Sequence, residues 1–329
     1  MTTRRSEASL FQRAFDVVAD ASVVLSYSAI GYNVRSRHFQ TLHQDMRTKH
    51  VVITGANSGI GRAAAESLAR LGATMTLVCR NPARGERARD EIIAAAGHTN
   101  VTLRICDMSV IADVHRLCDD LLSEGRPIDR LVLNAGMLPD SQRITDEGLD
   151  ETFATNLLSG FVMTERLVPL LAKADGARVV NVTSGGMYTQ RLDLTLVQGE
   201  TDKFDGTIAY AQTKRAQVIL TELWSVRLAE AGIQCHAMHP GWADTAGVKT
   251  SLPTFHRMLG PVLRDANAGA DTMVWLCTTD ADIESGRLWL DRKKRKTHIM
   301  KRTRSHAGDR DALFELCTDL SNRLALPAR

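Results

Sequence analysis

The sequence places a phenol and an ammonium four residues apart, Tyr210 and Lys214 in the segment Tyr-Ala-Gln-Thr-Lys. On a helix this spacing puts both side chains on one face. A phenol has an ordinary pKa of about 10, so alone it exchanges protons poorly at neutral pH. A neighbouring ammonium stabilises the phenolate, and the pair can then pass a proton to or from a bound oxygen atom. Tyr188 is the competing phenol, but Leu192 stands four residues after it.

Two more polar side chains are placed to assist such a proton transfer. Ser184 follows the apolar segment 178–183, and Asn156 lies in a helical pattern near 149–173. Ligands of parallel sheets bind at the carboxyl ends of the strands, so the Ser184 hydroxyl is expected beside Tyr210, where it would hold a substrate oxygen. Thr183 is the competing hydroxyl. The Asn156 amide could hold a water molecule that links Lys214 to solvent.

A glycine-rich turn follows the predicted strand 50–54 and opens the predicted helix 60–71. Glycines let the backbone turn tightly and approach a pyrophosphate, whose charge is stabilised at a helix N-terminus. The spacing is G-x-x-x-G-x-G, whereas G-x-G-x-x-G is commoner. A plain strand-to-helix turn is the alternative, but it needs fewer glycines. We predict a dinucleotide site formed by Gly55, Asn57, Ser58, Gly59, Ile60 and Gly61.

The residues after the next strands indicate which dinucleotide is bound. Strand 74–79 is followed by Arg80, at the place where NAD-preferring enzymes usually carry an acid. A guanidinium suits a 2′-phosphate, so Arg80 favours NADP(H), with NAD(H) left open. A solvated Arg80 is the alternative, and Arg62 could add positive field. The residues expected beside the adenine are Asp107 and Met108, and those expected to form the floor of the cofactor site are Asn134, Ala135 and Gly136.

Short apolar strands alternate with helical patterns between residues 50 and 291. Strands are expected at 50–54, 74–79, 101–106, 128–134, 178–183, 233–238 and 287–291, and helices near 60–71, 82–96, 110–123, 149–173 and 208–231. Strands that are each followed by a helix form βαβ units with a parallel sheet covered on both faces. Right-handed crossovers then give a doubly wound α/β sheet, a Rossmann fold.

The composition excludes several classes of protein. The chain has 329 residues, of which 44% are hydrophobic, enough for a sizeable core. Its 41 Lys and Arg against 38 Asp and Glu give a net charge of +3, which argues against a dedicated nucleic-acid binder. The six cysteines are scattered without a CxxC motif, so we expect reduced thiols and a cytoplasmic location. His236 and His239 lie three apart, but no further ligands complete a metal site, and none is predicted.

Two segments outside the alternating pattern have two interpretations each. Residues 1–46 contain an interrupted apolar stretch, shorter than the roughly 18–20 residues that a spanning helix needs. They form either a helix packed on the fold or an amphipathic segment on a membrane surface. The basic run Arg292–Lys296 forms either a solvated turn or a contact with an anion or a membrane surface. Peripheral membrane contact therefore stays open.

The order of these motifs resembles the short-chain dehydrogenase/reductase family. The resemblance covers about residues 50–291 and includes Pro240-Gly241 after the sixth strand. It implies NAD(P)-dependent oxidoreduction, with Tyr210 as general acid–base and Lys214 lowering its pKa and binding the nicotinamide ribose. It also implies that Ser184 orients the carbonyl, that Asn156 holds the relay water, and that Pro240 and Gly241 join the cofactor site.

A narrower resemblance is carried by the stretches RVVNVTSGGM, FDGTIAYAQTKRAQVILTELW and MHPGWADTAGV. They are similar to the dehydrogenase/reductase SDR family member 12 group, a branch related to retinol-dehydrogenase-like enzymes. We predict an N-terminal helical extension at 1–46, a catalytic domain at 47–291 and a basic segment with a helix at 292–329. The family implies a homodimer through the helices near 149–173 and 208–231.

The substrate is expected to be a lipophilic carbonyl or alcohol. The segments 185–209 and 242–262 are free to wall the site. The apolar side chains of the second segment are Trp242, Val248, Leu252, Phe255, Met258 and Leu259. An amphipathic surface helix is the alternative for these residues. Two functions of other classes also stay open, a non-catalytic dinucleotide sensor and a membrane-associated scaffold.

Overall fold

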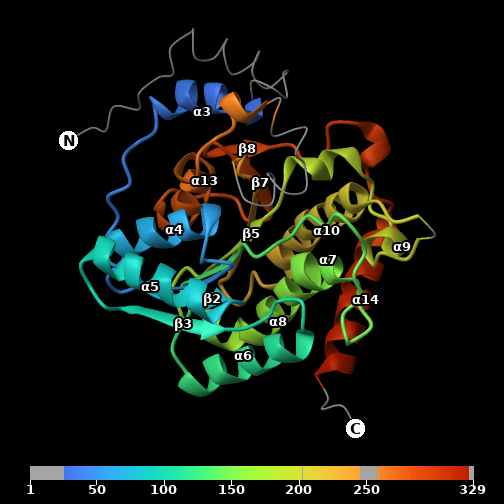
Figure 1. Cartoon of the computed structure of the whole chain (residues 1–329), viewed down its shortest axis with the longest axis horizontal. Helices are drawn as coiled ribbons and strands as arrows, with labels where there is room; N and C mark the ends of the chain where they lie inside the picture. Colours follow the sequence, from blue (N-terminus) through green and yellow to red (C-terminus); the bar gives the residue numbers. More distant parts are fainter. Residues whose placement is uncertain (1–25, 202, 245–256, 258, 326–329) are drawn as a thin grey trace.

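A computed structural model describes residues 26–201, 203–244, 257 and 259–325. Eight strands form one sheet in the order β3-β2-β1-β4-β5-β6-β7-β8. Strands β1 to β7 are parallel to their neighbours, and β8 is antiparallel to β7. The strands are β1 (His50–Thr54), β2 (Thr74–Cys79), β3 (Val101–Ile105), β4 (Arg130–Leu133), β5 (Arg178–Val182), β6 (Gln234–Met238), β7 (Arg287–Leu290) and β8 (Lys293–Arg295). The predicted doubly wound sheet is confirmed (Figure 1).

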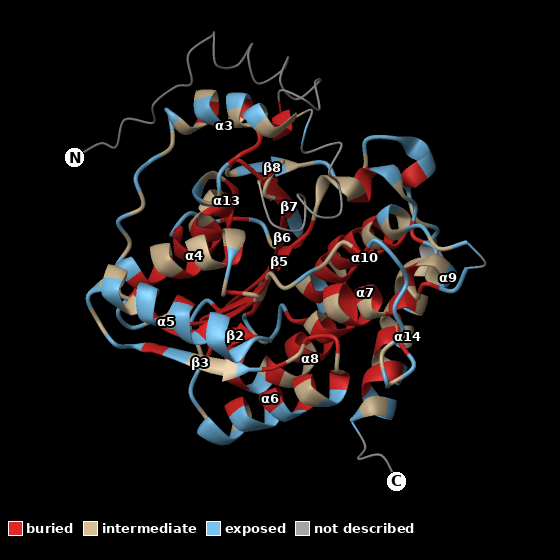
Figure 2. Ribbon diagram, in the orientation of Figure 1, coloured by how far each residue is buried: buried red, intermediate tan, exposed pale blue. Residues whose placement is uncertain are grey.

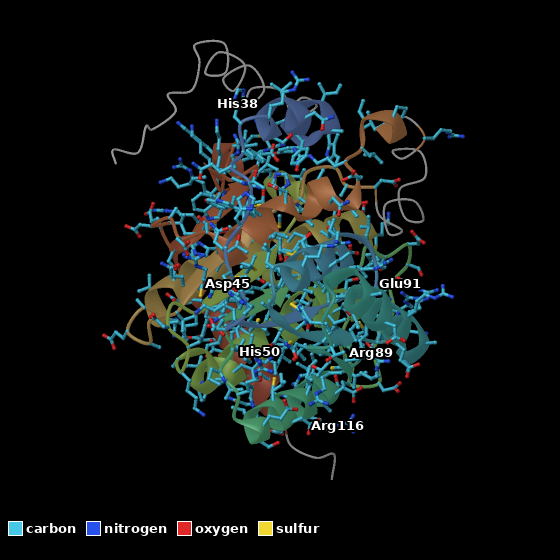
Figure 3. All side chains as sticks on the ribbon, turned by 90° about the vertical axis from the view of Figure 1, so that its left-hand side faces the viewer. His38, Asp45, His50, Arg89, Glu91 and Arg116 are labelled. Atoms are coloured by element: carbon cyan, nitrogen blue, oxygen red, sulfur yellow. The ribbon has the colours of Figure 1, made fainter. Side chains whose placement is uncertain are left out.

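The central strands are buried on both faces, which explains their continuous apolar sequences. Every residue of β1, β2, β4 and β5 is buried, whereas the edge strand β3 buries only its first residue. Figure 2 shows the buried strands enclosed between helices whose outer faces are exposed. The labelled side chains of Glu91 and Arg116 lie on such outer faces (Figure 3).

Two layers of helices cover the sheet. The first comprises α4 (Gly59–Arg70), α5 (Pro82–Ala96) and α13 (Ala266–Thr278), which pack on one another around one buried cluster. The second comprises α6 (Ile111–Glu124), α8 (Ser159–Leu171), α10 (Gly206–Arg227) and α14 (Ala307–Leu324), around a second cluster. The short α7 (Glu151–Phe153) and α9 (Leu194–Val197) border the second layer.

The C-terminal helix α14 covers the apolar face of α8 and α10. Leu313 and Cys317 are fully buried there, and the rings of Phe314 and Phe161 meet edge to face at 5.1 Å. Phe161 in turn packs against Trp224 of α10. This is the face through which the sequence predicts a four-helix dimer contact, so α14 occupies it within the same chain.

The long helix expected near 149–173 is interrupted. After α7, residues Ala154–Leu158 form one π-helical turn before α8 begins. π-Turns inside helices occur frequently at functional sites, and this one carries Asn156. Periodicity alone does not locate such a turn, because a single five-residue turn is too short to show a period of its own.

The described part of the N-terminal extension packs on the body of the fold. Helix α3 (Ala29–Ser36) lies beside the turn between β7 and β8, because Arg35 on α3 pairs with Asp291 in that turn (Figure 1). The other half of the extension, residues 1–25, lies outside the described residues. Among the residues that are described, no helix combines the length and the apolar composition needed to cross a membrane.

The basic run 292–296 forms ion pairs in the fold. Arg292 contacts Asp271 at 2.6 Å, and Lys294 contacts Glu284 at 3.0 Å. Arg292 also stacks over the ring of Phe39. All six cysteines are buried as free thiols. Within the described ranges, no group of three or more His, Cys, Asp or Glu side chains is arranged to hold a metal ion.

Candidate active site

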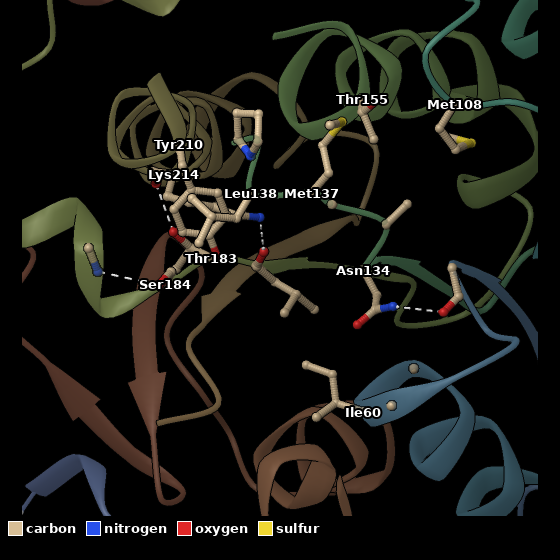
Figure 4. Close-up of a pocket in the computed structure, with 18 of the residues that line it drawn as sticks. Ile60, Met108, Asn134, Met137, Leu138, Thr155, Thr183, Ser184, Tyr210 and Lys214 are labelled. Carbon is tan, nitrogen blue, oxygen red and sulfur yellow. Dashed lines mark hydrogen bonds between the residues drawn. The ribbon is translucent and has the colours of Figure 1, made fainter. Parts of the chain in front are cut away.

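A cavity of about 820 Å³ opens at the carboxyl ends of the parallel strands. Strand order reverses between β1 and β4, and ligands of open α/β sheets bind at such a switch point. Figure 4 shows Tyr210, Lys214 and Ser184 at one end of the cavity and Met108 at the other. The predicted residues that line it are Gly55, Asn57, Ser58, Gly59, Ile60, Gly61, Arg80, Asp107, Met108, Asn134, Ala135, Gly136, Ser184, Tyr210, Lys214, Pro240 and Gly241.

The glycine-rich turn brings bare backbone to the cavity. Gly55 and Gly59 have positive φ angles of 67° and 55°, which side chains rarely allow. A Cβ on Gly61 would lie 2.3 Å from Asn134 Nδ2, so only glycine fits there. Asn134 in turn donates to the carbonyl oxygens of Thr54 and Gly55, at 2.9 and 3.2 Å. Asn134 on the floor of the cavity and the glycine-rich turn at residues 55–61 therefore fix each other's positions.

The N-terminus of α4 is available to an anion. Its N-cap residue, Ser58, makes no side-chain hydrogen bond to the first turn, and Gly59, Ile60 and Gly61 all line the cavity. Free N–H groups and the helix dipole both favour a negative group there. A side chain at Gly61 would fill the space beside the turn, and the N-terminus of α4 has no side-chain cap. Both features fit the pyrophosphate of a dinucleotide.

Helix α10 carries Tyr210 and Lys214 into the other end of the cavity. Asp205 caps its N-terminus by accepting from the N–H groups of Thr207 and Ile208. The Lys214 Nζ lies 5.5 Å from the centre of the Tyr210 ring and donates to the carbonyl oxygen of Val182 at 3.0 Å. Two residues one turn apart thus face the end of β5, as their spacing predicts.

Burial is the largest influence on the pKa of both groups. It lowers the pKa of Lys214 to about 7, since removal of water penalises the ammonium. It raises the pKa of Tyr210, while a hydrogen bond with Ser184 acts in the opposite direction. This differs from the simple expectation from sequence, in which the ammonium dominates and lowers the pKa of the phenol. The surrounding low dielectric keeps the phenol protonated.

The competing hydroxyls are bound elsewhere. Thr183 donates its hydroxyl hydrogen to the carbonyl oxygen of Lys214 at 2.7 Å. Tyr188 is buried and donates to the carbonyl oxygen of Lys296 at 2.7 Å. Thr183, Ser184 and Tyr210 all line the cavity, but the Thr183 hydroxyl hydrogen is already donated to the backbone, so Ser184 and Tyr210 are the better candidates for contact with a substrate oxygen.

Asn156 lies directly behind the cavity wall. Its side chain accepts from the Met137 N–H at 2.7 Å and donates to the Met137 carbonyl at 2.9 Å and to Thr213 at 3.1 Å. A Cβ on Gly136 would lie 3.2 Å from Lys214 Nζ and 3.4 Å from Asn156 Oδ1, so the three residues are neighbours. The amide holds the backbone after β4, and its role with a relay water stays a prediction.

Arg80 lies at the outer end of the cavity between two carboxylates. It is 67% exposed, and its Nη1 is 3.8 Å from Asp107 and 3.7 Å from Glu151. Arg143 pairs with the same Glu151 at 2.5 Å. Arg62 instead pairs with Glu91 on the outer face of α5 and is not among the residues that line the cavity. The Arg80 guanidinium is exposed and its two ion-pair contacts are long, so neither contact prevents it from meeting a phosphate.

The loop after β4 also lines the cavity, although no sequence motif pointed to it. Its lining residues are Met137, Leu138, Pro139, Asp140, Ser141 and Arg143, together with Glu151 and Thr155 of the next helical segment. These residues follow β4, a strand at the switch point, and ligands bind beyond the carboxyl ends of such strands. That position could have predicted them. Of the predicted wall 242–262, Trp242 and Ala243 line the cavity, and residues 245–256 and 258 lie outside the described residues.

Residues 49–254 match the family model of the short chain dehydrogenases. The chain belongs to the short-chain dehydrogenase family. It is 40% identical over 302 residues to bovine (Bos taurus) "Dehydrogenase/reductase SDR family member 12", covering 90% of this chain and 94% of that protein. It is 31% identical over 250 residues to mouse (Mus musculus) "Retinol dehydrogenase 12", covering 75% of this chain and 78% of that protein.

A solved short chain dehydrogenase from Escherichia coli, complexed with NADPH, superimposes with a TM-score of 0.61 at 22% identity. The alignment covers 77% of this chain and all of that one (100%), which shows the shared fold. Membership of the family makes the chain an NAD(P)-dependent oxidoreductase of the member 12-like branch.

Proposed function

We propose that the protein transfers hydride between NADP(H) and a lipophilic carbonyl or alcohol, using Ser184, Tyr210 and Lys214. The observation that carries the proposal is that Ser184, Tyr210 and Lys214 line one end of a cavity that begins at a glycine-rich helix N-terminus. When bound, the nicotinamide supplies or takes the hydride at the substrate carbon. The chain itself supplies orientation and the proton.

In the direction of reduction, Tyr210 donates its phenolic proton to the carbonyl oxygen as that oxygen gains charge. Ser184 donates a second hydrogen bond to the same oxygen and so fixes its position. Lys214, one turn along α10, stabilises the phenolate that remains and can return a proton to it. In oxidation of the alcohol the same proton moves in reverse.

The preference for NADP(H) is proposed from Arg80. A guanidinium at the end of β2 can form two parallel hydrogen bonds with a 2′-phosphate. The neighbouring carboxylates of Asp107 and Glu151 hold the side chain at the mouth of the cavity until the phosphate replaces them. Solved relatives of the same fold crystallised with NADPH and NADP agree with this choice.

The lipophilic substrate is proposed from the wall around Tyr210. Met137, Leu138, Pro139 and Trp242 present apolar surface to the cavity, and such walls bind apolar ligands. Relatives of this chain include proteins named retinol dehydrogenase, whose name denotes a lipophilic alcohol. Each buried methylene of a substrate would then contribute up to ~0.8 kcal/mol, about fourfold in kcat/KM.

The decisive experiment follows deuterium from NADPH deuterated at C4 into decanal, detected by mass spectrometry. We expect deuterated decanol with the unmodified protein. The Tyr210→Phe variant should lose ~10²–10⁴-fold in kcat while NADPH binding by calorimetry is kept, because only the proton donor is removed. Full activity in that variant would refute the role of Tyr210. A flat rate across C4–C12 aldehydes would refute the lipophilic site.

A further inference from the structure

Tyr27, in the segment before the sheet, touches the active-site wall from behind. A Cβ added to Gly185 would lie 3.1 Å from Cε2 of the Tyr27 ring, so the ring rests on the residue after Ser184. The carbonyl oxygen of Tyr27 accepts from the N–H of Trp242 at 2.8 Å, and the two rings meet edge to face at 6.0 Å. Ser184 and Trp242 both line the cavity. Tyr27 therefore contacts the cavity wall at two places, beside Ser184 and at Trp242. The end of the cavity that contains Ser184 and Tyr210 is called the substrate end below.

The Tyr27 side chain is also fixed through the 3₁₀ turn Gly185–Thr189. Tyr27 lies in one buried cluster with Tyr188 of this turn, and Tyr188 donates to the carbonyl oxygen of Lys296. The ring packs in a small buried cluster with Met187 and Tyr188, and it meets the His239 ring edge to face at 4.6 Å. The turn that follows Ser184 therefore packs against an aromatic ring from a segment about 160 residues earlier.

A buried charge cluster fixes the backbone of the same segment. Asp291 lies between Arg35 and Arg264, at 2.7 and 2.6 Å, and all three side chains are at most 1% exposed. The remaining guanidinium hydrogens bond to main-chain oxygens of the segment, those of Ser26, Tyr27 and Ser28. Two buried guanidinium groups face one carboxylate, and the excess positive charge is tolerated only because main-chain oxygens accept the remaining hydrogen bonds. These hydrogen bonds fix the path of the chain through residues 26–28.

Arg292 ties the next part of the segment to the same turn. It donates to the carbonyl oxygen of Gln40 at 2.7 Å and lies over the ring of Phe39 at 4.5 Å. The turn between β7 and β8 thus holds the extension at two points, through Asp291 and Arg292. Asp291 and Arg292 have positive φ angles of 53° and 55°, although neither is glycine. Such backbone is strained, and these contacts with the extension help to stabilise it.

We propose that Tyr27 is a positioning residue of the active site, and that residues 26–35, locked by Asp291, form a fixed outer wall of the substrate end. The proposal rests on the proposed function in taking the end with Ser184 and Tyr210 as the carbonyl site. It extends the catalytic unit to residues that lie before the family-matched region, which starts at 49.

The proposal separates substrate binding from cofactor binding. The glycine-rich turn and Arg80 lie at other parts of the cavity. The Tyr27 main chain lies against Gly241 of the predicted cofactor site, where a Cβ would be 2.7 Å from the Tyr27 carbonyl oxygen, whereas the Tyr27 ring faces Gly185 and Trp242. Removing the ring should let Gly185 and Trp242 shift, which displaces the carbonyl from Tyr210. Small displacements of reacting groups reduce rates by up to ~10²-fold.

The test compares Tyr27→Ala, Tyr27→Phe and a control, Phe314→Ala. Phe314 is also a packed aromatic residue, but it lies on α14, against Phe161 and Arg227. With decanal and saturating NADPH, we expect Tyr27→Ala to raise KM and lower kcat/KM about tenfold or more, at unchanged NADPH affinity by calorimetry. Tyr27→Phe keeps the ring and should stay within about threefold of the unmodified protein. Phe314→Ala should lose stability without a change in KM.

A second readout needs no substrate. Acrylamide should quench tryptophan fluorescence more strongly in Tyr27→Ala than in the unmodified protein, and the difference should vanish when Trp242→Phe is added. Unchanged KM and unchanged quenching in Tyr27→Ala would overturn the proposal, as would an equal rise of KM in Phe314→Ala. If the unmodified protein does not turn over decanal, the proposed substrate class fails separately, and the quenching result still decides the role of Tyr27.

Discussion

Gly61→Ala is expected to damage the cofactor site, although it only replaces one hydrogen atom by a methyl group. The added Cβ would lie 2.3 Å from Asn134 Nδ2 and 2.5 Å from the carbonyl oxygen of Gly55. Real Cβ atoms do not approach so closely, so the Asn134 amide or the turn must move. Movement weakens the two Asn134 hydrogen bonds at 2.9 and 3.2 Å.

The free energies can be compared. Overpacking of this kind costs typically ~1–3 kcal/mol, and two weakened hydrogen bonds cost roughly 0.5–1.5 kcal/mol each. Alanine in place of glycine in a helix returns only about 0.5–1 kcal/mol. The net loss is about 1–5 kcal/mol, and it falls on the turn that receives the pyrophosphate. If about 1.4 kcal/mol of it appears in binding, the Kd for NADPH rises about tenfold.

Calorimetric titration with NADPH and urea unfolding measure the two parts of this loss. Gly308→Ala is the matched control, because Gly308 also lies in the first turn of a helix, and a Cβ there would meet nothing within 4 Å. It should leave NADPH binding unchanged and stability unchanged or slightly higher. Equal NADPH affinity and equal stability in Gly61→Ala and the unmodified protein would refute the reasoning.

Three further outcomes are expected. Arg80→Asp should reverse the preference for NADPH over NADH in titrations, because it places a carboxylate beside the 2′-phosphate; equal binding of both by the unmodified protein would count against this. If charged Lys214 is required, kcat/KM for reduction should fall as pH rises through about 7, since burial lowers its pKa to about 7 and the ammonium is lost above that value; a flat profile from pH 6 to 9 would contradict it. Sedimentation velocity should show a 36.1 kDa monomer, because α14 covers the face of α8 and α10 that a four-helix dimer would use; a species of twice that mass would show that pairing uses another face.

Local patterns in the sequence predicted most of the fold. The strands from 50 to 291 are short apolar runs, and apart from the edge strand β3 the structure buries nearly all of their residues, so composition and length were sufficient to find them. The glycine-rich turn, Ser184 and the Tyr210–Lys214 pair were found for a related reason. Each motif lies within a few residues, and its distance from a strand end decides whether it faces the cavity.

Contacts between distant residues could not be found in this way. The Asn156 π-turn, the two carboxylates beside Arg80 and the cover of α14 over Phe161 depend on elements that meet only when the sheet is assembled. Arg35 and Asp291 lie 256 residues apart, and neither has a local signal for its partner. The sequence by itself determined which chemistry the site can do, because that depends on residue types at strand ends. Only the tertiary structure decided what encloses the site, because burial and charge pairing depend on which segments pack together.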